Sequence, residues 1–558
     1  MTGRRFGRRR GEREIAPDEI FLDSSNLPEF NQGRLEGKLE KPVSRAAYAG
    51  ILLAVALTFF GLIAQAANLQ IREGERYALQ SERNRVRPEV MFAKRGAIVD
   101  RNGNPLVYND ESEEGFVKRH YESPGFGHLL GYVSYPKKDS SGNYYDTEIK
   151  GLAGVEAAFN DVLAGRNGTL LIEENALGEV QSQGQVAAAK DGATLTLSID
   201  ARAQKAFASS IAELAQRIPF TGAAAILMDV ETGEIHALAS YPEYDPNILS
   251  SGGPGEVIAG YQNDSRRPYL DRAIAGLYAP GSIVKPMEAA GALHDGIIDP
   301  EKTIFSSGQL VVPNPYDPSK PTIFKDWKAL GAMNMRSAIA YSSDVYFYTV
   351  GGGFGDQRGL GIKRLGEWFR AFGFDTPTGI ELEGEAEGFI PSPEWKERTY
   401  DEPWRIGNTY HTAIGQYAMQ ITPIEAARAV AAVANGGKLL RPTLLKSSMT
   451  PAGERIDISP YALQVAREGM RMGVTEGTSV GLSALSFTTI AGKTGTAQLG
   501  ANNEYHHAWA IGFFPYEKPK YAYVVLMEKG PAGNVIGGIY ATYHALSRLH
   551  QAAPEYFE

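Results

Sequence analysis

The strongest hydrophobic pattern in the chain lies near its start. Residues 46–67 (AAYAGILLAVALTFFGLIAQAA) form a run without a charged side chain. As a helix this run would measure about 33 Å, enough to cross a hydrocarbon layer of about 30 Å. A buried core helix is usually shorter, and a signal peptide cleaved after Ala64-Gln65-Ala66 would have a shorter apolar core. We therefore predict an uncleaved transmembrane helix at 46–67.

The segment before this run is polar and rich in arginine. Residues 1–13 hold six arginines against one acid, Glu12. The rest of the segment is mixed in charge and lacks a helical period, so we predict a largely disordered tail over 1–45. Because positive charge stays on the cytoplasmic side of a membrane, we expect this tail in the cytoplasm and the rest of the chain outside.

Residues 68–199 alternate in short apolar runs separated by glycine-rich turns. The run at 97–99 predicts a strand that is closed by the Asn102-Gly103 turn, and a helix is expected near 155–163. The segment contains no pairing of acids or histidines that suggests chemistry. We interpret 68–199 as a pedestal that holds another domain away from the membrane.

From residue 200 to 558 the pattern predicts one large α+β domain. Two early apolar strands are joined by a Glu231-Thr232-Gly233 turn, helical periods fill the middle, and three strands and a helix follow. The expected strands are 223–230, 235–240, 487–496, 508–514 and 521–528, and the expected helices include 360–372, 422–434 and 540–552. This order predicts a five-stranded antiparallel sheet flanked by helices.

Composition excludes several classes of function. The 558 residues suggest three or four domains, and 56 basic against 65 acidic side chains give a net charge of −9. A dedicated nucleic-acid binder needs clustered basic charge, so we expect no nucleic-acid partner. The chain has no cysteine, which excludes disulfides, thiolate metal sites and a thiol nucleophile. His506-His507 is an isolated pair, interpreted as loop polarity, so no metal site is expected.

Three short motifs stand in order within the large domain. They are Ser282-Ile283-Val284-Lys285, Ser342-Ser343-Asp344 and Lys493-Thr494-Gly495-Thr496. Each is unspecific alone, since Ser134-Tyr135-Pro136-Lys137 and Ser141-Gly142-Asn143 match the first two patterns in a glycine-rich loop. Context must therefore distinguish the functional motifs from the chance matches.

The context of Ser282 suits a nucleophile. Pro286 can stand only within the first turn of a helix, so a helix should begin near Ser282 and place Lys285 on the same face. Free N–H groups at a helix start favour a developing alkoxide. A buried lysine among cationic neighbours can lose its proton and act as a general base.

The third motif belongs to a predicted strand. A strand edge can pair with an extended peptide, a Lys/Thr pair can hold the terminal carboxylate of that peptide, and Gly495 leaves room for close approach. Gly492-Lys493-Thr494 also imitates the end of a phosphate-binding loop. That loop would need glycine at position 487, where this chain has Phe487, so we reject it.

In this order the three motifs resemble those of penicillin-recognising serine enzymes. Residues 222–235 and 239–247 are similar to the start of the class B penicillin-binding protein transpeptidase domain, and 95–103 and 154–163 are similar to its pedestal. Stretches between 393 and 423, together with Asp344, resemble elongation-type members, the penicillin-binding protein 2 group. The resemblance covers residues 95 to about 545 and implies the penicillin-binding/serine β-lactamase-like fold.

The resemblance implies a membrane-anchored peptidoglycan D,D-transpeptidase without a cofactor. Ser282 would attack the D-Ala–D-Ala carbonyl of a stem peptide, with Lys285 as base, and an acceptor amine would then take the acyl group. Ser342 and Lys493 would relay protons and Asp344 would orient Lys285. Thr494, Gly495 and Thr496 would bind the substrate, and the N–H groups of Ser282 and Thr496 would form the oxyanion hole.

The resemblance also implies stem peptides and β-lactams as ligands, a SEDS-type glycosyltransferase and elongation-complex membrane proteins as partners, and a place in the bacterial inner (plasma) membrane with the catalytic domain external. Two departures stand out. Only 24 residues separate Gly103 from His128, so the head subdomain of the pedestal is reduced, and Tyr417 follows Gly415-Gln416 where a small residue is common.

Other functions stay open at this point. Residues 68–200 are too few for a second, glycosyltransferase domain, and no cysteine supports a lipid anchor. A catalytically quiet β-lactam sensor or scaffold, a membrane-bound serine β-lactamase and a D,D-carboxypeptidase are the alternatives. No glutamate from Glu367 to Glu476 has Asn four residues later, which argues against the class A β-lactamase pattern. Asp344 stands where a class D enzyme has an apolar residue.

Overall fold

A computed structural model describes residues 44–174, 180–314, 316–446 and 453–558. The predicted disordered tail, 1–45, lies outside the described residues except for its last two positions. The chain divides into two compact units. One comprises Met1–Arg87 and Glu173–Gln181, and the other comprises Pro88–Ile172 and Ser182–Glu558.

The first unit contains the predicted apolar helix. Helix α1 covers Arg45–Ala67 and begins where the Ser44 side chain accepts a hydrogen bond from the Ala47 N–H. A π-helical turn, Asn68–Arg72, follows, and then helix α2, Gly74–Arg85. Within the span Arg45–Arg72, a stretch of 18 residues has a mean hydropathy of 2.2, and none of that stretch is buried. By length and composition it is the one helix in the described part of the chain that could cross a membrane.

The part of the pedestal that lies in the second unit is built from short strands. Strands β11, β2, β3 and β4 form a sheet in that order, and the turn expected at Asn102-Gly103 connects β2 to β3. The predicted helix over 155–163 is divided at Phe159, whose backbone leaves the helical region. The elements are β2 (Ile98–Val99), β3 (Pro105–Asp110), β4 (Lys118–Tyr121), β11 (Leu195–Thr196), α4 (Gly154–Ala158) and α5 (Asn160–Leu163).

A fully buried ion cluster holds this region together, and we call Arg95, Arg119 and Glu156 the pedestal ion cluster. Arg95 Nε donates to Glu156 Oε2 at 2.6 Å, and Arg119 Nη2 donates to Glu156 Oε1 at 2.6 Å. The other nitrogens of the two guanidinium groups donate to nearby carbonyl and amide oxygens, including Ile149 O and Gly96 O, both at 2.9 Å. Every nitrogen of the two guanidinium groups therefore has a hydrogen-bond acceptor, although the cluster carries two positive charges and one negative charge.

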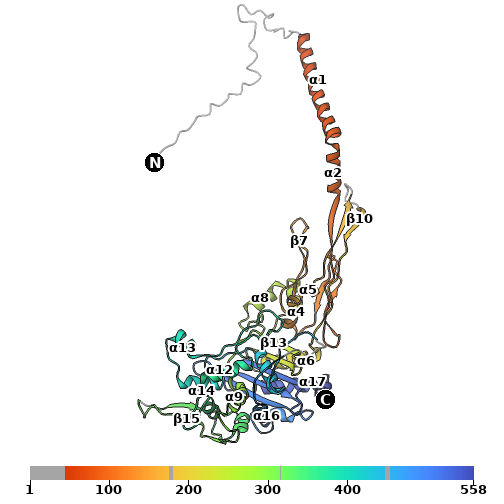
Figure 1. Cartoon of the computed structure of the whole chain (residues 1–558). Coiled ribbons are helices and arrows are strands. Elements are labelled where there is room, and N and C mark those ends of the chain that lie inside the picture. Colours follow the sequence, from red (N-terminus) through yellow and green to blue (C-terminus); the bar gives the residue numbers. More distant parts are fainter. Residues whose placement is uncertain (1–43, 175–179, 315, 447–452) are drawn as a thin grey trace, which may run out of the picture. The chain divides into compact units, whose positions relative to one another are not determined.

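The predicted five-stranded antiparallel sheet lies at the centre of the large domain (Figure 1). Its strands follow the order β13-β12-β22-β21-β20. Its first two strands come early in the chain and the other three come late, as the sequence predicted. Side chains alternate along β12, so that Ala223 and Ala225 face one core and Ala224 and Ile226 face the other. The strands are β12 (Gly222–Asp229), β13 (Ile235–Tyr241), β20 (Ala491–Leu499), β21 (Tyr505–Phe514) and β22 (Tyr521–Pro531).

Helices cover both faces of the sheet. Helices α6 and α17 pack on one face, while α15 and α16 pack on the other together with α9. Their starts follow local signals, because Asp200 caps α6 and Thr422 forms a capping box with Glu425 in α15. The bounds are α6 (Ala201–Arg217), α9 (Lys285–His294), α15 (Pro423–Ala434), α16 (Pro460–Thr475) and α17 (Gly538–Ala552).

Two details of the expected strands were wrong. Residues 487–490 do not belong to the strand predicted at 487–496, because Phe487 stacks on His550 of α17, with 4.0 Å between ring centroids. The pair His506-His507, expected in a loop, lies inside strand β21, and both side chains are buried. Burial lowers the pKa of His507 to about 4, so this histidine is uncharged at neutral pH.

Shorter elements complete the chain. The strands are β1 (Val86–Met91), β9 (Gly168–Glu174), β10 (Val180–Ala187), β5 (Val133–Ser134), β6 (Lys137–Lys138), β7 (Tyr144–Asp146), β8 (Lys150–Gly151), β14 (Ile304–Ser306), β15 (Gln309–Val312), β16 (Thr322–Lys325), β17 (Gly331–Met333), β18 (Lys438–Leu439) and β19 (Glu454–Arg455). The helices are α3 (Gly127–Leu130), α7 (Pro246–Ser251), α8 (Gly255–Asn263), α10 (Met335–Tyr341), α11 (Asp344–Gly352), α12 (Gly361–Ala371), α13 (Pro393–Tyr400) and α14 (Ile406–Ala413).

Candidate active site

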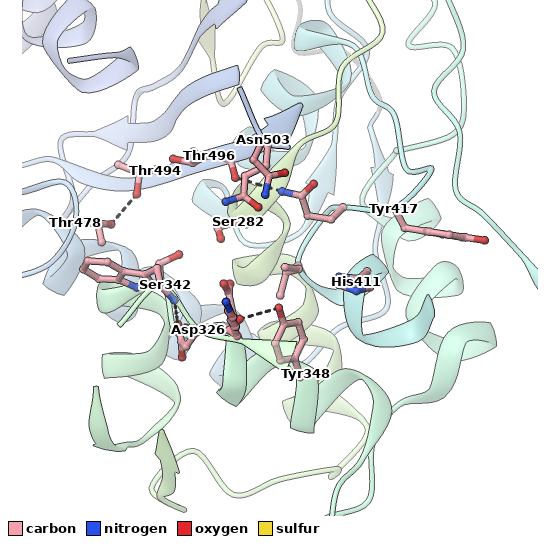
Figure 2. A pocket seen from close by; sticks show the side chains of 16 residues that line it. Ser282, Asp326, Ser342, Tyr348, His411, Tyr417, Thr478, Thr494, Thr496 and Asn503 are labelled. Carbon is pink, nitrogen blue, oxygen red and sulfur yellow. Dashed lines mark hydrogen bonds between the residues drawn. The ribbon is translucent and has the colours of Figure 1, made fainter. Parts of the chain in front are cut away.

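The three motifs meet at one open cavity of about 960 Å³. Ser282, Ser342, Asp344, Thr494 and Thr496 all line it, although they come from three separate parts of the chain. Figure 2 shows the side chain of Ser282 between the strand that carries Thr494 and Thr496 and the turn that carries Ser342. The volume lies at the upper end of the usual range for ligand pockets, which leaves room for an extended substrate.

Ser282 lies in a tight turn directly before α9. Gly281–Val284 form one 3-10 turn, and Lys285 and Pro286 open the α-helix, as the position of Pro286 predicted. Gly281 has φ +57° and its N–H donates to Gly415 O at 2.8 Å. A Cβ at Gly281 would lie 2.8 Å from Thr496 O, so glycine is needed for this turn to approach strand β20.

Lys285 is fully buried and holds the second motif. Its Nζ donates to Asp344 Oδ1 at 2.6 Å, to Ser342 O at 2.9 Å and to Ser342 Oγ at 3.4 Å. Burial raises the pKa of Asp344, and the charge and hydrogen bond of Lys285 act in the opposite direction. The lysine predicted as a base therefore has a carboxylate and a serine hydroxyl within reach.

Lys493 approaches the same serine from strand β20. Its Nζ lies 2.8 Å from Ser342 Oγ and 2.8 Å from Thr494 O, and the side chain is buried. Burial lowers the pKa of Lys493 well below its usual range, and the positive charge of Lys285 lowers it further. These shifts favour a neutral amine that can exchange a proton with the Ser342 hydroxyl.

Ser342 occupies a strained joint between two helices. It ends α10 with φ +60° and ψ +41°, and Ser343 then caps α11 by accepting a hydrogen bond from the Tyr346 N–H at 3.2 Å. A left-handed conformation is uncommon for a residue other than glycine and is maintained only by its surroundings. In this left-handed conformation the Ser342 hydroxyl points toward both lysines.

Strand β20 forms an edge of the five-stranded sheet beside the cavity. Thr494, Thr496 and Gln498 occupy every second position of the strand and line the cavity. Thr494 Oγ1 donates to Thr478 Oγ1 at 2.7 Å. A Cβ at Gly495 would lie 2.7 Å from Ile283 Cγ2 and 2.8 Å from Pro280 O, so glycine lets the strand pack against the Ser282 turn. An edge strand of this kind can pair with an extended peptide.

Five of the eight predicted site residues thus line one cavity. Lys285 and Lys493 are buried and contact Ser342, and Gly495 lies between Thr494 and Thr496 on β20. The chance matches lie elsewhere, since Ser134 belongs to β5 and Lys137 is exposed on β6. Tyr417, noted as a departure, has φ +67° and packs edge-to-face on Trp395 and Trp404 at the cavity rim.

The sequence reasoning missed several lining residues. They are Lys325, Asp326, Trp327, Tyr348, His411, Ile414, Gln416, Thr478, Gln498 and Asn503. Of these, Asp326 and Trp327 follow a short strand and touch a motif that begins about fifteen positions later. No local pattern marks such residues, because their partners are set by the fold.

Comparison with known proteins assigns the chain to a family. Residues 223–542 match the family model described as the penicillin binding protein transpeptidase domain. The chain belongs to this family. Residues 114–197 also match the penicillin-binding protein dimerisation domain. The combination of pedestal and transpeptidase domains makes the chain a class B penicillin-binding protein.

Similar proteins support the same assignment. The peptidoglycan D,D-transpeptidase MrdA of Haemophilus influenzae is 32% identical over 473 residues, which cover 77% of this chain and 69% of that protein. PBP2 of Helicobacter pylori, solved in complex with MreC, gives a TM-score of 0.70 at 27% identity and covers 84% of this chain and 99% of that one.

A chain from a peptidoglycan synthase complex that coordinates polymerization and crosslinking gives a TM-score of 0.70 at 26% identity, over 91% of this chain and 98% of that one. The predicted fold and family are confirmed. The chain is an MrdA-like, serine-type D,D-transpeptidase of the penicillin-binding family.

Proposed function

We propose that this D,D-transpeptidase cross-links peptidoglycan stem peptides during cell elongation through an acyl-enzyme on Ser282. The observation that carries the proposal is that Lys285 Nζ and Lys493 Nζ both contact the Ser342 hydroxyl. This hydroxyl lies beside the turn that contains Ser282 and beside the edge strand β20. In the first step Ser282 Oγ attacks the D-Ala–D-Ala carbonyl and loses its proton to the side-chain amine of Lys285, which acts as the base. The bond to the terminal D-Ala then breaks.

The proton reaches the leaving amine through the second and third motifs. Ser342 Oγ lies between the two lysine nitrogens, so it can receive a proton from one side while it gives one to the leaving group. Asp344 orients Lys285, with which it shares a 2.6 Å contact. In the second step an acceptor amine attacks the Ser282 ester, and the same groups move the proton in reverse.

Substrate binding follows from strand β20. The extended stem peptide adds to the edge of the sheet, and Thr494 and Thr496 hold its terminal carboxylate, while Gly495 keeps the strand close to Ser282. The N–H groups of Ser282 and Thr496 stabilise the oxyanion. The proposed chemistry uses side chains of this chain alone and requires no metal or cofactor.

We further propose the division of the chain expected from its sequence. Residues 1–45 form a cytoplasmic tail, 46–67 a single inner-membrane span, 68–199 the pedestal and 200–558 the external transpeptidase domain. The apolar helix Arg45–Ala67 supports the span. Because relatives are known in a complex with MreC and in a peptidoglycan synthase complex, we propose a SEDS-type glycosyltransferase and elongation-complex membrane proteins as partners.

A test of this function separates transfer from hydrolysis. The full-length protein in detergent is given a stem pentapeptide together with an amine acceptor, and separately the β-lactam nitrocefin. We expect release of D-Ala, formation of the peptide joined to the acceptor, and an acyl-enzyme that persists for many minutes. The described cavity lining contains no glutamate to activate water, which supports slow hydrolysis.

Three other outcomes would each favour a different function. Sustained nitrocefin turnover of about 1 per second or faster would identify a β-lactamase. Release of D-Ala without the joined product would identify a carboxypeptidase. Acylation by β-lactams without any reaction of the stem peptide would identify a sensor or scaffold.

A further inference from the structure

One carboxylate outside the three motifs holds the second motif in place. Asp326 follows strand β16, and its side chain is nearly buried at 8% exposure. Three of its donors belong to the motif and the start of α11: Ser343 Oγ at 2.8 Å, the Asp344 N–H at 3.1 Å and the Val345 N–H at 3.2 Å. Asp326 therefore binds the segment directly after Ser342 at three points.

Asp326 is itself fixed from the other side. Ser306 Oγ of β14 donates to Asp326 Oδ2 at 2.9 Å, and the Asp326 N–H donates to Gly308 O at 2.8 Å. The neighbouring Trp327 donates its indole N–H to Tyr341 O at 3.1 Å, at the last residue of α10. Asp326 and Trp327 thus form hydrogen bonds with residues on both sides of Ser342.

These contacts stabilise an unfavourable backbone conformation at Ser342. Ser342 has φ +60°, a conformation that a serine leaves readily when nothing opposes it. A small rotation there would move the Ser342 hydroxyl away from Lys493 Nζ, which lies 2.8 Å away, and the Asp344 carboxylate away from Lys285 Nζ. A misplacement of about 1 Å in a catalytic group can lower a rate by about 100-fold.

We propose that Asp326 is a positioning residue that holds the Ser342 hydroxyl and the Asp344 carboxylate in their reactive geometry. This inference rests on the proposed function of Ser342 and Asp344. It assigns a role in catalysis to the segment between β16 and α10, which belongs to none of the three motifs.

The charge of Asp326 gives the proposal a second, independent signature. Burial raises the pKa of Asp344, Lys285 opposes this shift, and the nearby negative charge of Asp326 raises the pKa further. Lys493 on β20, His411 on α14 and Tyr348 on α11 are the other titratable groups coupled to Asp344. Replacing Asp326 by a neutral residue should therefore lower the pKa of Asp344.

The test compares Asp326→Asn with the wild type and with Asp317→Asn. Asp317 lies in the loop between the paired strands β15 and β16, the second of which ends directly before Asp326, and serves as the matched control. Its side chain makes only local contacts, to Ser319 and Lys320. Acylation of the full-length protein by a fluorescent penicillin is followed over a range of drug concentrations, which separates the binding constant from the acylation rate constant. The thermal midpoint is measured in parallel.

We expect the acylation rate constant of Asp326→Asn to fall by about 10- to 100-fold, with little change in the binding constant. The acid limb of its pH profile should move to lower pH, because the pKa of Asp344 falls when the neighbouring charge is removed. Asp317→Asn should behave as the wild type. Should Asp326→Asn fail to fold, Ser343→Ala, which removes one of the three contacts, should lower the same rate constant by a smaller factor.

Several results would overturn the inference. One is a wild-type acylation rate constant in Asp326→Asn, or in Ser343→Ala if only that variant folds. Another is a loss that affects the binding constant alone. A third is a pH profile of Asp326→Asn whose acid limb does not move. A wild-type protein that fails to acylate would instead refute the proposed function, so the two failures are distinguishable.

Discussion

Two buried charge clusters in this enzyme use different cations for different purposes. In the pedestal ion cluster one carboxylate, Glu156, lies between two arginines, and the guanidinium groups also donate to backbone and amide oxygens. In the active site the charged groups around Ser342 are two lysines and the carboxylate Asp344. An arginine stays charged in any protein environment, whereas a buried lysine can become neutral.

The comparison separates structural charge from chemical charge. Full hydrogen bonding of the pedestal ion cluster stabilises the fold of this region. In the active site, burial and the positive charge of Lys285 lower the pKa of Lys493, so that a proton can move. Exchanging or removing one charge at a time in each cluster tests this separation.

The largest effect is expected for Lys285→Arg. The guanidinium keeps the positive charge beside Asp344 but has no accessible neutral form, so it cannot take the proton of Ser282. The rate of acylation by a fluorescent penicillin should fall by about 10³-fold, equivalent to about 4 kcal/mol in the barrier, while the circular dichroism spectrum is retained. Acylation at nearly the wild-type rate would show that Lys285 is not the base.

A second prediction applies the same logic to the pedestal. Glu156→Gln leaves Arg95 and Arg119 without a compensating charge in a fully buried site. The free energy of unfolding should fall by about 3 kcal/mol or more, measured by urea unfolding. Acylation per folded molecule should be unchanged.

An exposed pedestal pair provides the control for this experiment. Glu114 and Lys118 form an ion pair at 2.7 Å with about half of each side chain exposed. Glu114→Gln should change the free energy of unfolding by less than about 1 kcal/mol. Equal destabilisation by Glu114→Gln and Glu156→Gln would contradict a special role for the buried cluster.

The smallest effect concerns pH and Lys493. Its pKa in the folded protein lies well below the ordinary value of 10.5. Between these two values unfolding takes up a proton, so the free energy of unfolding rises with pH by at most about 1.4 kcal/mol per pH unit. Lys493→Met removes this contribution.

Thermal midpoints of both proteins, measured from about pH 7 to about pH 9, test this sign. The wild type should gain stability relative to Lys493→Met as pH rises. A difference between the two midpoints that stays constant with pH would mean that the pKa of Lys493 is not lowered in the folded protein.

Much of this account follows from the sequence, and the exceptions have physical causes. A continuous apolar run followed by a turn predicted strand β12, and the position of Pro286 predicted a helix start near Ser282, because both signals are local. Phe487 looked like part of a strand but packs on α17, since its apolar neighbours in the chain do not specify which surface covers it.

The candidate site shows the same limit. The three motifs could be recognised, but nothing local predicts that Asp326 binds Ser343 from seventeen positions away. The pedestal ion cluster also escaped the sequence reasoning, because Arg95 and Glu156 are 61 residues apart and meet only in the folded chain.

The identity of the nucleophile is the central claim, and one mass measurement tests it directly. Full-length wild-type protein and Ser282→Ala are each incubated with benzylpenicillin, and the intact masses are recorded. We predict that the wild type gains the mass of one drug molecule and that Ser282→Ala gains none. An adduct on Ser282→Ala, for instance at Ser134, would contradict the assignment of Ser282 and the mechanism built on it.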